Sequence, residues 1–126
     1  MKIINYEYSS TNFSVNFENK INLLVDNSGT GKTFLLNMLK FYCDEGGISC
    51  AHVDYLHQDV ILDNKDILLF DRADLYLTSA MFNKISSLDA TSIISIKSTV
   101  DLNLVGDIGF YRVLYYNKSI VTRRWG

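Results

Sequence analysis

The feature that most constrains the fold is the segment of residues 26–33, because it separates two stretches with different hydrophobic patterns. Residues 21–25 form a short apolar run rich in branched side chains, which predicts a buried strand. Apolar residues recur at helical spacing over residues 34–42, and Gly46-Gly47 then favours the end of a helix. The sequence therefore predicts a strand, a glycine-containing loop and a helix over residues 33–44, in that order.

The composition of this loop is typical of a phosphate-binding site. Gly29 and Gly31 allow the backbone to turn so that successive N–H groups point inward, and the following helix adds its N-terminal dipole. Lys32 can reach the outer phosphates of a nucleotide, and the Thr33 hydroxyl can bind Mg²⁺. The predicted phosphate-binding residues are Asn27, Ser28, Gly29, Thr30, Gly31, Lys32 and Thr33.

A second motif occurs at residues 67–71, where four bulky apolar residues precede Asp71. A continuous apolar run is typical of a strand that is covered on both faces of a parallel sheet. An acid at its carboxyl end would lie beside the phosphate-binding loop, where it can bind Mg²⁺ directly or through water. The alternative is a core strand followed by an unrelated aspartate in the next turn.

Together the two motifs resemble those of the P-loop NTPase superfamily. Residues 27–33 are most similar to the loop of the ATP-binding-cassette, SMC and RecF-type branch, and residues 67–71 resemble a Walker B strand. The resemblance implies ATP or GTP as the bound nucleotide and Mg²⁺ as the metal ion, with Thr33 and Asp71 as metal ligands.

The remaining pattern predicts an α/β fold with three layers. We expect a mostly parallel central sheet of the P-loop NTPase type, with antiparallel hairpins added at the N- and C-termini, in a single minimal nucleotide-binding domain of residues 1–126. Only 33 residues separate Thr33 from Ile67, which leaves no room for the helical subdomain of a transporter cassette. The predicted strands are 2–8, 13–17, 21–25, 49–53, 67–71, 92–96, 110–116 and 119–124, with a second helix at 75–87 and no assignment for 54–66.

Two positions depart from the family pattern. Asp26 stands where the first glycine of the loop belongs, and its carboxylate would repel phosphates or pair with Lys32, so it predicts weakened nucleotide affinity. Arg72 follows Asp71, where the family usually has a glutamate that activates water. Asp74 is the nearest acid that can substitute as a catalytic base, although an acid also suits the start of a helix. The pattern predicts slow hydrolysis.

The resemblance to the ATP-binding-cassette, SMC and RecF-type branch implies that the strand at residues 92–96 lies between the strands that carry the two motifs. In the family, the end of this strand often carries a polar residue that senses the γ-phosphate, which makes Ser95, Lys97 and Ser98 candidates. Lys97 is a candidate catalytic residue as a second cation near the phosphates, and the alternative is an exposed lysine at a strand end.

Composition limits the class of partner. The net charge of −2 and the pI near 5.5 do not indicate nucleic-acid binding, and the sequence has neither a leader-like segment nor a membrane-length apolar run. Cys43 and Cys50 indicate reduced thiols, and we expect a cytoplasmic protein without membrane contact. The nearby residues His52, His57, Asp54 and Asp59 are assigned ordinary loop or surface roles rather than a metal site.

Three functions remain open at this point. The chain is a minimal NTPase that hydrolyses ATP or GTP slowly or with a partner; or it is a degenerate, non-hydrolysing regulatory or assembly module; or it is a small-molecule phosphotransferase. The last is disfavoured because no arginine-rich lid follows Asp71. The predicted partners are a nucleotide and either a second protein or another copy of the chain.

Overall fold

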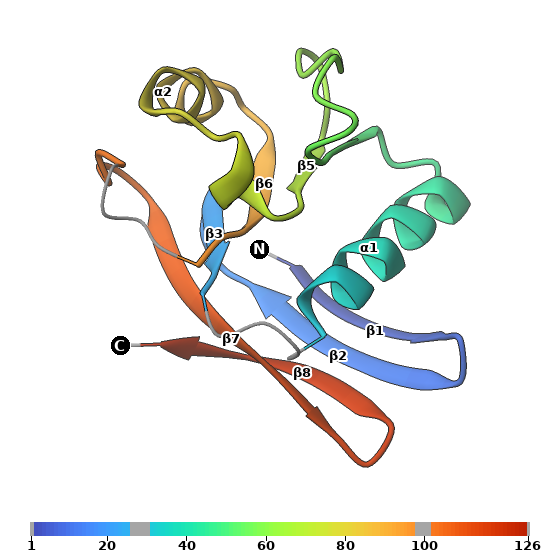
Figure 1. Ribbon diagram of the computed structural model, residues 1–126. Coiled ribbons are helices and arrows are strands. Elements are labelled where there is room, and N and C mark those ends of the chain that lie inside the picture. The colour runs from blue at the N-terminus through green and yellow to red at the C-terminus, as the bar shows by residue number, and fades with distance from the viewer. Residues whose placement is uncertain (1, 26–30, 98–101, 126) are drawn as a thin grey trace.

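The computed structural model describes residues 2–25, 31–97 and 102–125 (Figure 1). Most of the secondary-structure elements are strands. The elements are β1 (Lys2–Tyr8), β2 (Thr11–Phe17), β3 (Ile21–Leu24), α1 (Lys32–Gly46), β4 (Cys50–Val53), β5 (Ile67–Phe70), the 3₁₀ helix η1 (Ala73–Leu75), α2 (Ser79–Ser86), β6 (Thr91–Ser95), β7 (Ile108–Tyr116) and β8 (Ser119–Trp125).

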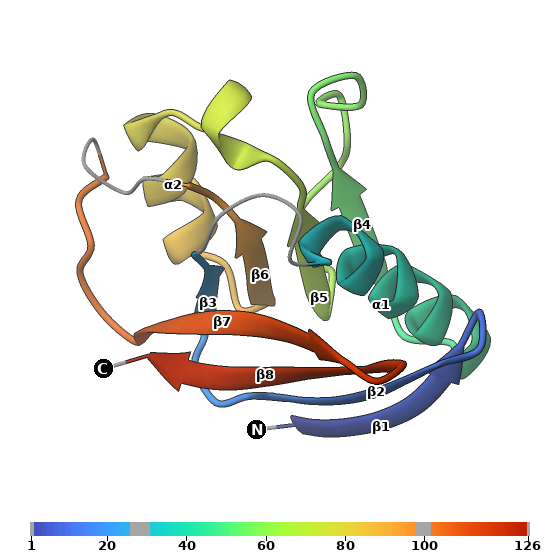
Figure 2. The same ribbon diagram turned by 60° about the horizontal axis from the view of Figure 1, so that its bottom comes forward.

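The eight described strands form one sheet in the order β1-β2-β8-β7-β3-β6-β5-β4. The two hairpin pairs, β1–β2 and β7–β8, are antiparallel. The hairpins join each other through a parallel β2–β8 pair, and β7, β3, β6, β5 and β4 are parallel neighbours. The sheet curves strongly, so the hairpin strands form one wall and β3 to β4 form another (Figure 2).

The prediction of a three-layer, mostly parallel P-loop-type fold is wrong. The protein is a strand-rich half-barrel with mixed strand directions, and its described residues contain two α-helices. The hairpins supply four of the eight strands and form a wall of the sheet, whereas the prediction placed them as additions to a parallel core. Residues 54–66 form no helix and contain one isolated bridge, between Asp54 and His57, so the described part of the chain lacks the helices needed for two full layers.

The hairpins form where alternation of apolar and polar residues predicts them. In β2 every second side chain is buried, beginning with Thr11 and ending with Phe17, as expected for a strand with one covered face. The turns at Ser9-Ser10 and Asn117-Lys118 have positive φ at both central residues, the conformation of type I′ turns. Such turns match the right-handed twist of the strands they connect.

Each helix covers a different face of the sheet, and two separate cores result (Figure 2). Helix α1 lies within the curve and packs against side chains of both hairpins and of β3, β5 and β6. Helix α2 packs on the opposite face against β3, β4, β5 and β6. Strands β3, β5 and β6 are therefore covered on both sides and buried at nearly every residue, and β5 is continuously apolar.

The elements nearest the two motifs agree with the sequence-based expectations in their order. Strand β6 lies between β3 and β5, and the three strands are parallel, so their carboxyl ends open at one edge of the sheet. The second helix begins at Ser79 rather than at residue 75, because residues 73–75 form the 3₁₀ helix η1 and Thr78 caps α2 through the amide of Met81. No helix within the described residues is long and apolar enough to cross a membrane.

Candidate functional site

Helix α1 begins immediately after Gly31, whose φ of 90° lies in the left-handed region. A side chain at this position would be strained, so glycine is required by the backbone. The Gly31 carbonyl accepts a hydrogen bond from the Leu35 amide at 2.9 Å and so starts the helical ladder. Gly31 offers no side chain to cap this end of α1, and within the described residues the amides at the helix N-terminus form a site suited to an anion.

The two predicted metal ligands lie together. The Thr33 hydroxyl donates a hydrogen bond to Asp71 Oδ1 at 3.1 Å, which joins the first turn of α1 to the end of β5. Asp71 is buried, and its amide donates to the Val53 carbonyl at 2.9 Å, which fixes its backbone against β4. A hydroxyl and a carboxylate are oxygen ligands of the kind that Mg²⁺ prefers.

This pair would be a partial coordination shell. The described residues contain no group of three or more His, Cys, Asp or Glu side chains that could hold a metal ion. Mg²⁺ in nucleotide sites usually takes one or two protein ligands and completes its shell with phosphate oxygens and water. The donor set of Thr33 and Asp71 therefore fits a Mg²⁺ ion that arrives with phosphate, and it does not fit a metal held by protein alone.

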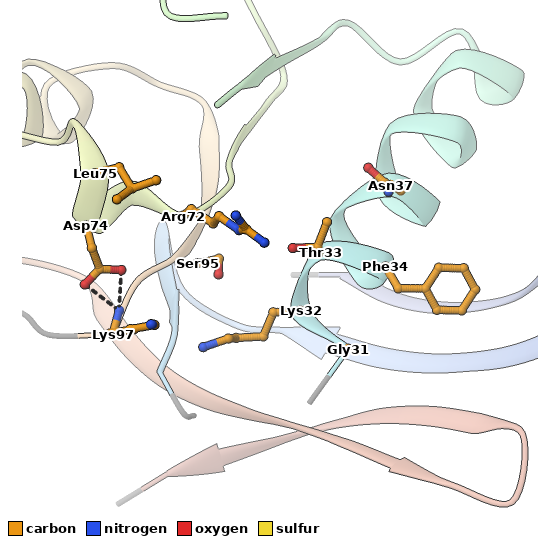
Figure 3. A pocket seen from close by; sticks show the side chains of 10 residues that line it. All are labelled: Gly31, Lys32, Thr33, Phe34, Asn37, Arg72, Asp74, Leu75, Ser95 and Lys97. Atoms are coloured by element: carbon orange, nitrogen blue, oxygen red, sulfur yellow. Dashed lines mark hydrogen bonds between the residues drawn. The ribbon is translucent and has the colours of Figure 1, made fainter. Parts of the chain in front are cut away.

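A cavity of about 700 Å³ opens beside this pair (Figure 3). Its volume is within the range of small-molecule sites. One wall comes from the start of α1 and the other from the ends of β5 and β6. The lining residues are Gly31, Lys32, Thr33, Phe34, Asn37, Arg72, Asp74, Leu75, Ser95 and Lys97.

Three cations line this cavity. Lys32 is buried, and its side chain extends from the start of α1 toward the wall that carries Lys97 (Figure 3). Lys97 and Arg72 are exposed and belong to that opposite wall. A cavity with cationic groups on facing walls is suited to a ligand with several negative charges.

Asp74, the predicted substitute base, makes a specific contact. Both oxygens of its carboxylate accept the backbone N–H of Lys97, at 2.7 and 2.8 Å (Figure 3). This contact fixes η1 to the segment that follows β6. Asp74 is therefore a positioning residue for the wall that presents Ser95 and Lys97.

The sequence analysis did not predict the roles of two residues at the site. Arg72 was interpreted only as the loss of an acid, yet its side chain lines the cavity, and its φ of 50° is left-handed. The Tyr76 hydroxyl lies 3.1 Å from the Val53 carbonyl and 2.9 Å from the Asp71 carbonyl, so its one proton is shared between acceptors at the ends of β4 and β5. Burial raises the pKa of Tyr76, which keeps this donor protonated. No sequence pattern marks either role.

The other candidate residues of the sequence analysis either lie outside the described residues or do not line the cavity. Asp26, the loop residues 27–30 and Ser98 lie outside the described residues. His57 pairs with Asp54 at 2.8 Å on the exposed loop after β4. His52 is half-buried on β4; burial lowers its pKa, and its Nε2 atom has no partner within the described part of the chain.

Comparisons of the chain with protein-family models, with curated proteins and with solved structures find no match. The functional argument therefore depends on the geometry of the cavity and on the chemistry of its residues.

Proposed function

We propose that this protein binds a nucleoside triphosphate, ATP or GTP, together with Mg²⁺ in the cavity at the start of α1, and hydrolyses it slowly or only with a protein partner. The observation that carries the proposal is the hydrogen bond of 3.1 Å between Thr33 and Asp71. Two residues that lie 38 positions apart, each predicted to bind Mg²⁺, are joined by this bond, and one of them, Thr33, lines a cavity of suitable size.

Each group has a distinct task in this proposal. The N-terminal amides of α1 and the Lys32 ammonium bind the phosphate chain, and the sequence pattern of residues 27–33 predicts further amides there. Thr33 and Asp71 hold Mg²⁺, which when bound neutralises phosphate charge and orients the phosphate oxygens. Lys97 and Ser95 approach the outer phosphates from the opposite wall.

Turnover is expected to be slow because, among the described residues that line the cavity, the one acid is Asp74, and its carboxylate is already engaged. The residue after Asp71 is an arginine, and the nearest following acid, Asp74, is bound to the Lys97 amide. A general base must lie within hydrogen-bond reach of the proton that it removes. The same observation favours the second candidate function, a non-hydrolysing regulatory or assembly module that binds nucleotide and a protein partner.

Thermal unfolding with and without Mg-ATP and Mg-GTP tests the proposal. Ligand at about 100 times its dissociation constant should stabilise the protein by about 2.7 kcal/mol. For 126 residues this corresponds to a rise in Tm of about 10 °C. Lys32→Ala should abolish the shift, and Lys118→Ala, which removes a cation from the exposed β7–β8 turn, should retain it.

The outcomes separate the candidates. Absence of a shift with both nucleotides in the parent protein refutes nucleotide binding. If binding is found, phosphate release above background, with and without a second copy or partner, separates the slow NTPase from the non-hydrolysing module. A shift that Lys32→Ala leaves intact would locate the nucleotide away from this cavity.

A further inference from the structure

We propose that Arg72 binds the terminal phosphate and makes this cavity select nucleoside triphosphates over diphosphates. This inference rests on the proposed function and adds a specificity-determining residue to it. Arg72 stands where an acid would promote hydrolysis, and in its place it gives the site a means of distinguishing the two nucleotide states. The argument depends on the conformation, the direction and the surroundings of its side chain.

The backbone of Arg72 holds an unfavourable conformation directly after Asp71. Its φ of 50° and ψ of 51° are left-handed, which costs roughly 1 kcal/mol or more for a residue other than glycine. The turn starts the 3₁₀ helix η1 and brings the Arg72 side chain to the cavity rather than to the α2 face of the sheet. In Figure 3 the guanidinium is directed toward the Thr33 hydroxyl, at the predicted Mg²⁺ position.

The other charged groups divide into cations that face the cavity and carboxylates that face its walls. The ammonium groups of Lys32 and Lys97 point toward one another across the cavity below Arg72 in the view of Figure 3. The carboxylate of Asp71 is bound to Thr33, and that of Asp74 is bound to the Lys97 amide. The space between the two walls is therefore bordered by three cations and by one carboxylate, that of Asp74, which already accepts the Lys97 amide.

The end of a triphosphate fits this arrangement better than the end of a diphosphate. Lys32 and the amides of α1 fix the inner phosphates against one wall. The opposite wall, with Arg72 and Lys97, is then reached by the terminal phosphate, which carries the highest charge and three free oxygens. A planar guanidinium binds two such oxygens at once, and a diphosphate held by the same inner contacts leaves this pair of cations without a phosphate.

The test is the ratio of the dissociation constants for Mg-ADP and Mg-ATP, measured by isothermal titration. The variant is Arg72→Gly, because glycine adopts the left-handed conformation without strain and the variant should fold. Lys118→Gly is the matched control: it also removes an exposed cation at a positive φ, 60°, but in the β7–β8 turn away from the cavity. Arg72→Lys keeps the charge and loses the planar fork.

We expect the parent protein and Lys118→Gly to bind Mg-ATP at least about tenfold more tightly than Mg-ADP. Arg72→Gly should reduce this ratio about tenfold by weakening ATP binding alone, and Arg72→Lys should reduce it by less. An unchanged ratio in Arg72→Gly, or equal weakening of both nucleotides, overturns this inference and leaves nucleotide binding in place. A parent protein that binds neither nucleotide, with GTP and GDP also tested, refutes the proposed function and this inference with it.

Discussion

Replacement of Gly109 by alanine should destabilise the protein strongly, although glycine and alanine differ by one methyl group. Gly109 lies in β7 opposite Asn22 of β3, and it packs against the side chain of Asn19 in the β2–β3 connection. A Cβ atom at this position would lie 2.0 Å from Asn19 Oδ1 and 2.6 Å from Asn19 Cγ. Both distances are far below van der Waals contact, so one of the two residues must move.

Asn19 cannot move without loss of hydrogen bonds. It is buried, and its Oδ1 accepts from the Tyr111 hydroxyl at 2.7 Å while its Nδ2 donates to Asp107 at 2.7 Å. Its carbonyl accepts from Asn22 Nδ2 at 2.8 Å. A shift of about 1.4 Å, needed to restore ordinary contact, would break the bond to Tyr111 and leave a buried polar group unpaired.

The magnitude follows from these two effects. Overpacking of a close contact costs roughly 1 to 3 kcal/mol, and a buried hydrogen bond that loses its partner costs a further 1 to 3 kcal/mol, roughly. With an unfolding entropy of about 0.26 kcal/mol/K for 126 residues, the sum of roughly 2 to 6 kcal/mol lowers Tm by about 8 to 23 °C.

Thermal unfolding followed by circular dichroism measures this change, with two controls. Gly46→Ala is the matched control, because the nearest atom to its Cβ is an Ile48 side-chain carbon at 3.6 Å; its Tm should equal or slightly exceed that of the parent. In an Asn19→Ala background both contacts with Asn19 are removed and only the contact of 3.0 Å with Tyr111 Cε1 remains, so Gly109→Ala should cost much less there. A Tm of Gly109→Ala within about 2 °C of the parent, or an equal loss in both backgrounds, would refute the reasoning.

Three further predictions concern the surroundings of the site. Asp74→Asn keeps an oxygen that accepts the Lys97 amide, so its Mg-ATP affinity and its rate of phosphate release should match those of the parent protein. Asp74→Ala removes this acceptor and should weaken Mg-ATP binding. Loss of phosphate release in Asp74→Asn would instead identify Asp74 as a general base. Tyr76→Phe removes the donor to the carbonyl of Asp71 and should lower the free energy of unfolding by about 1 kcal/mol in a urea titration; an unchanged midpoint contradicts this. Burial lowers the pKa of His52, so below pH about 6.5 the unfolded chain binds a proton that the folded chain does not, and the free energy of unfolding falls as the pH decreases. His52→Gln should therefore flatten the dependence of stability on pH between roughly pH 5 and 6.5. An equal slope in the parent and the variant would exclude His52 as the source of this dependence.

Local sequence patterns predicted the individual elements well and their assembly poorly. Alternation at residues 11–17 and helical spacing at residues 34–42 depend on neighbours in the chain, and both elements form. The curvature depends on the parallel pair of β2 with β8, in which only residues 12–14 face residues 119–121. Nothing local marks that contact between distant segments, so the hairpins were interpreted as additions to a parallel sheet rather than as one wall of it.

In the candidate site, too, some features could be predicted from the sequence and others could not. Thr33 and Asp71 could be placed together from the sequence because each follows a strand, and carboxyl ends of parallel strands share one edge. The role of Arg72 depends on a left-handed φ at a residue that is not glycine, and the contact of Asp74 depends on how η1 meets the end of β6. Backbone conformations of this kind are set by tertiary packing, and residue type alone does not predict them.

The curved wall gives the start of α1 a support that a three-layer fold would obtain from additional helices. Phe34, in the first turn of α1, packs on Phe13 and Tyr8 of the β1–β2 hairpin with ring centroids 5.3 and 5.7 Å apart. A Cβ on Gly31 would lie 3.4 Å from Ile120 of β8, so the second hairpin also reaches the start of the helix. The Thr33–Asp71 hydrogen bond fixes the other side of this turn to β5. The proposed phosphate site is thus held between the two walls of the half-barrel. Because rigid placement of binding groups lowers the entropic cost of binding, we expect the hairpins to contribute to the affinity of the proposed site, although the cavity is lined by Gly31 and by residues of α1, β6 and the segments that follow β5 and β6.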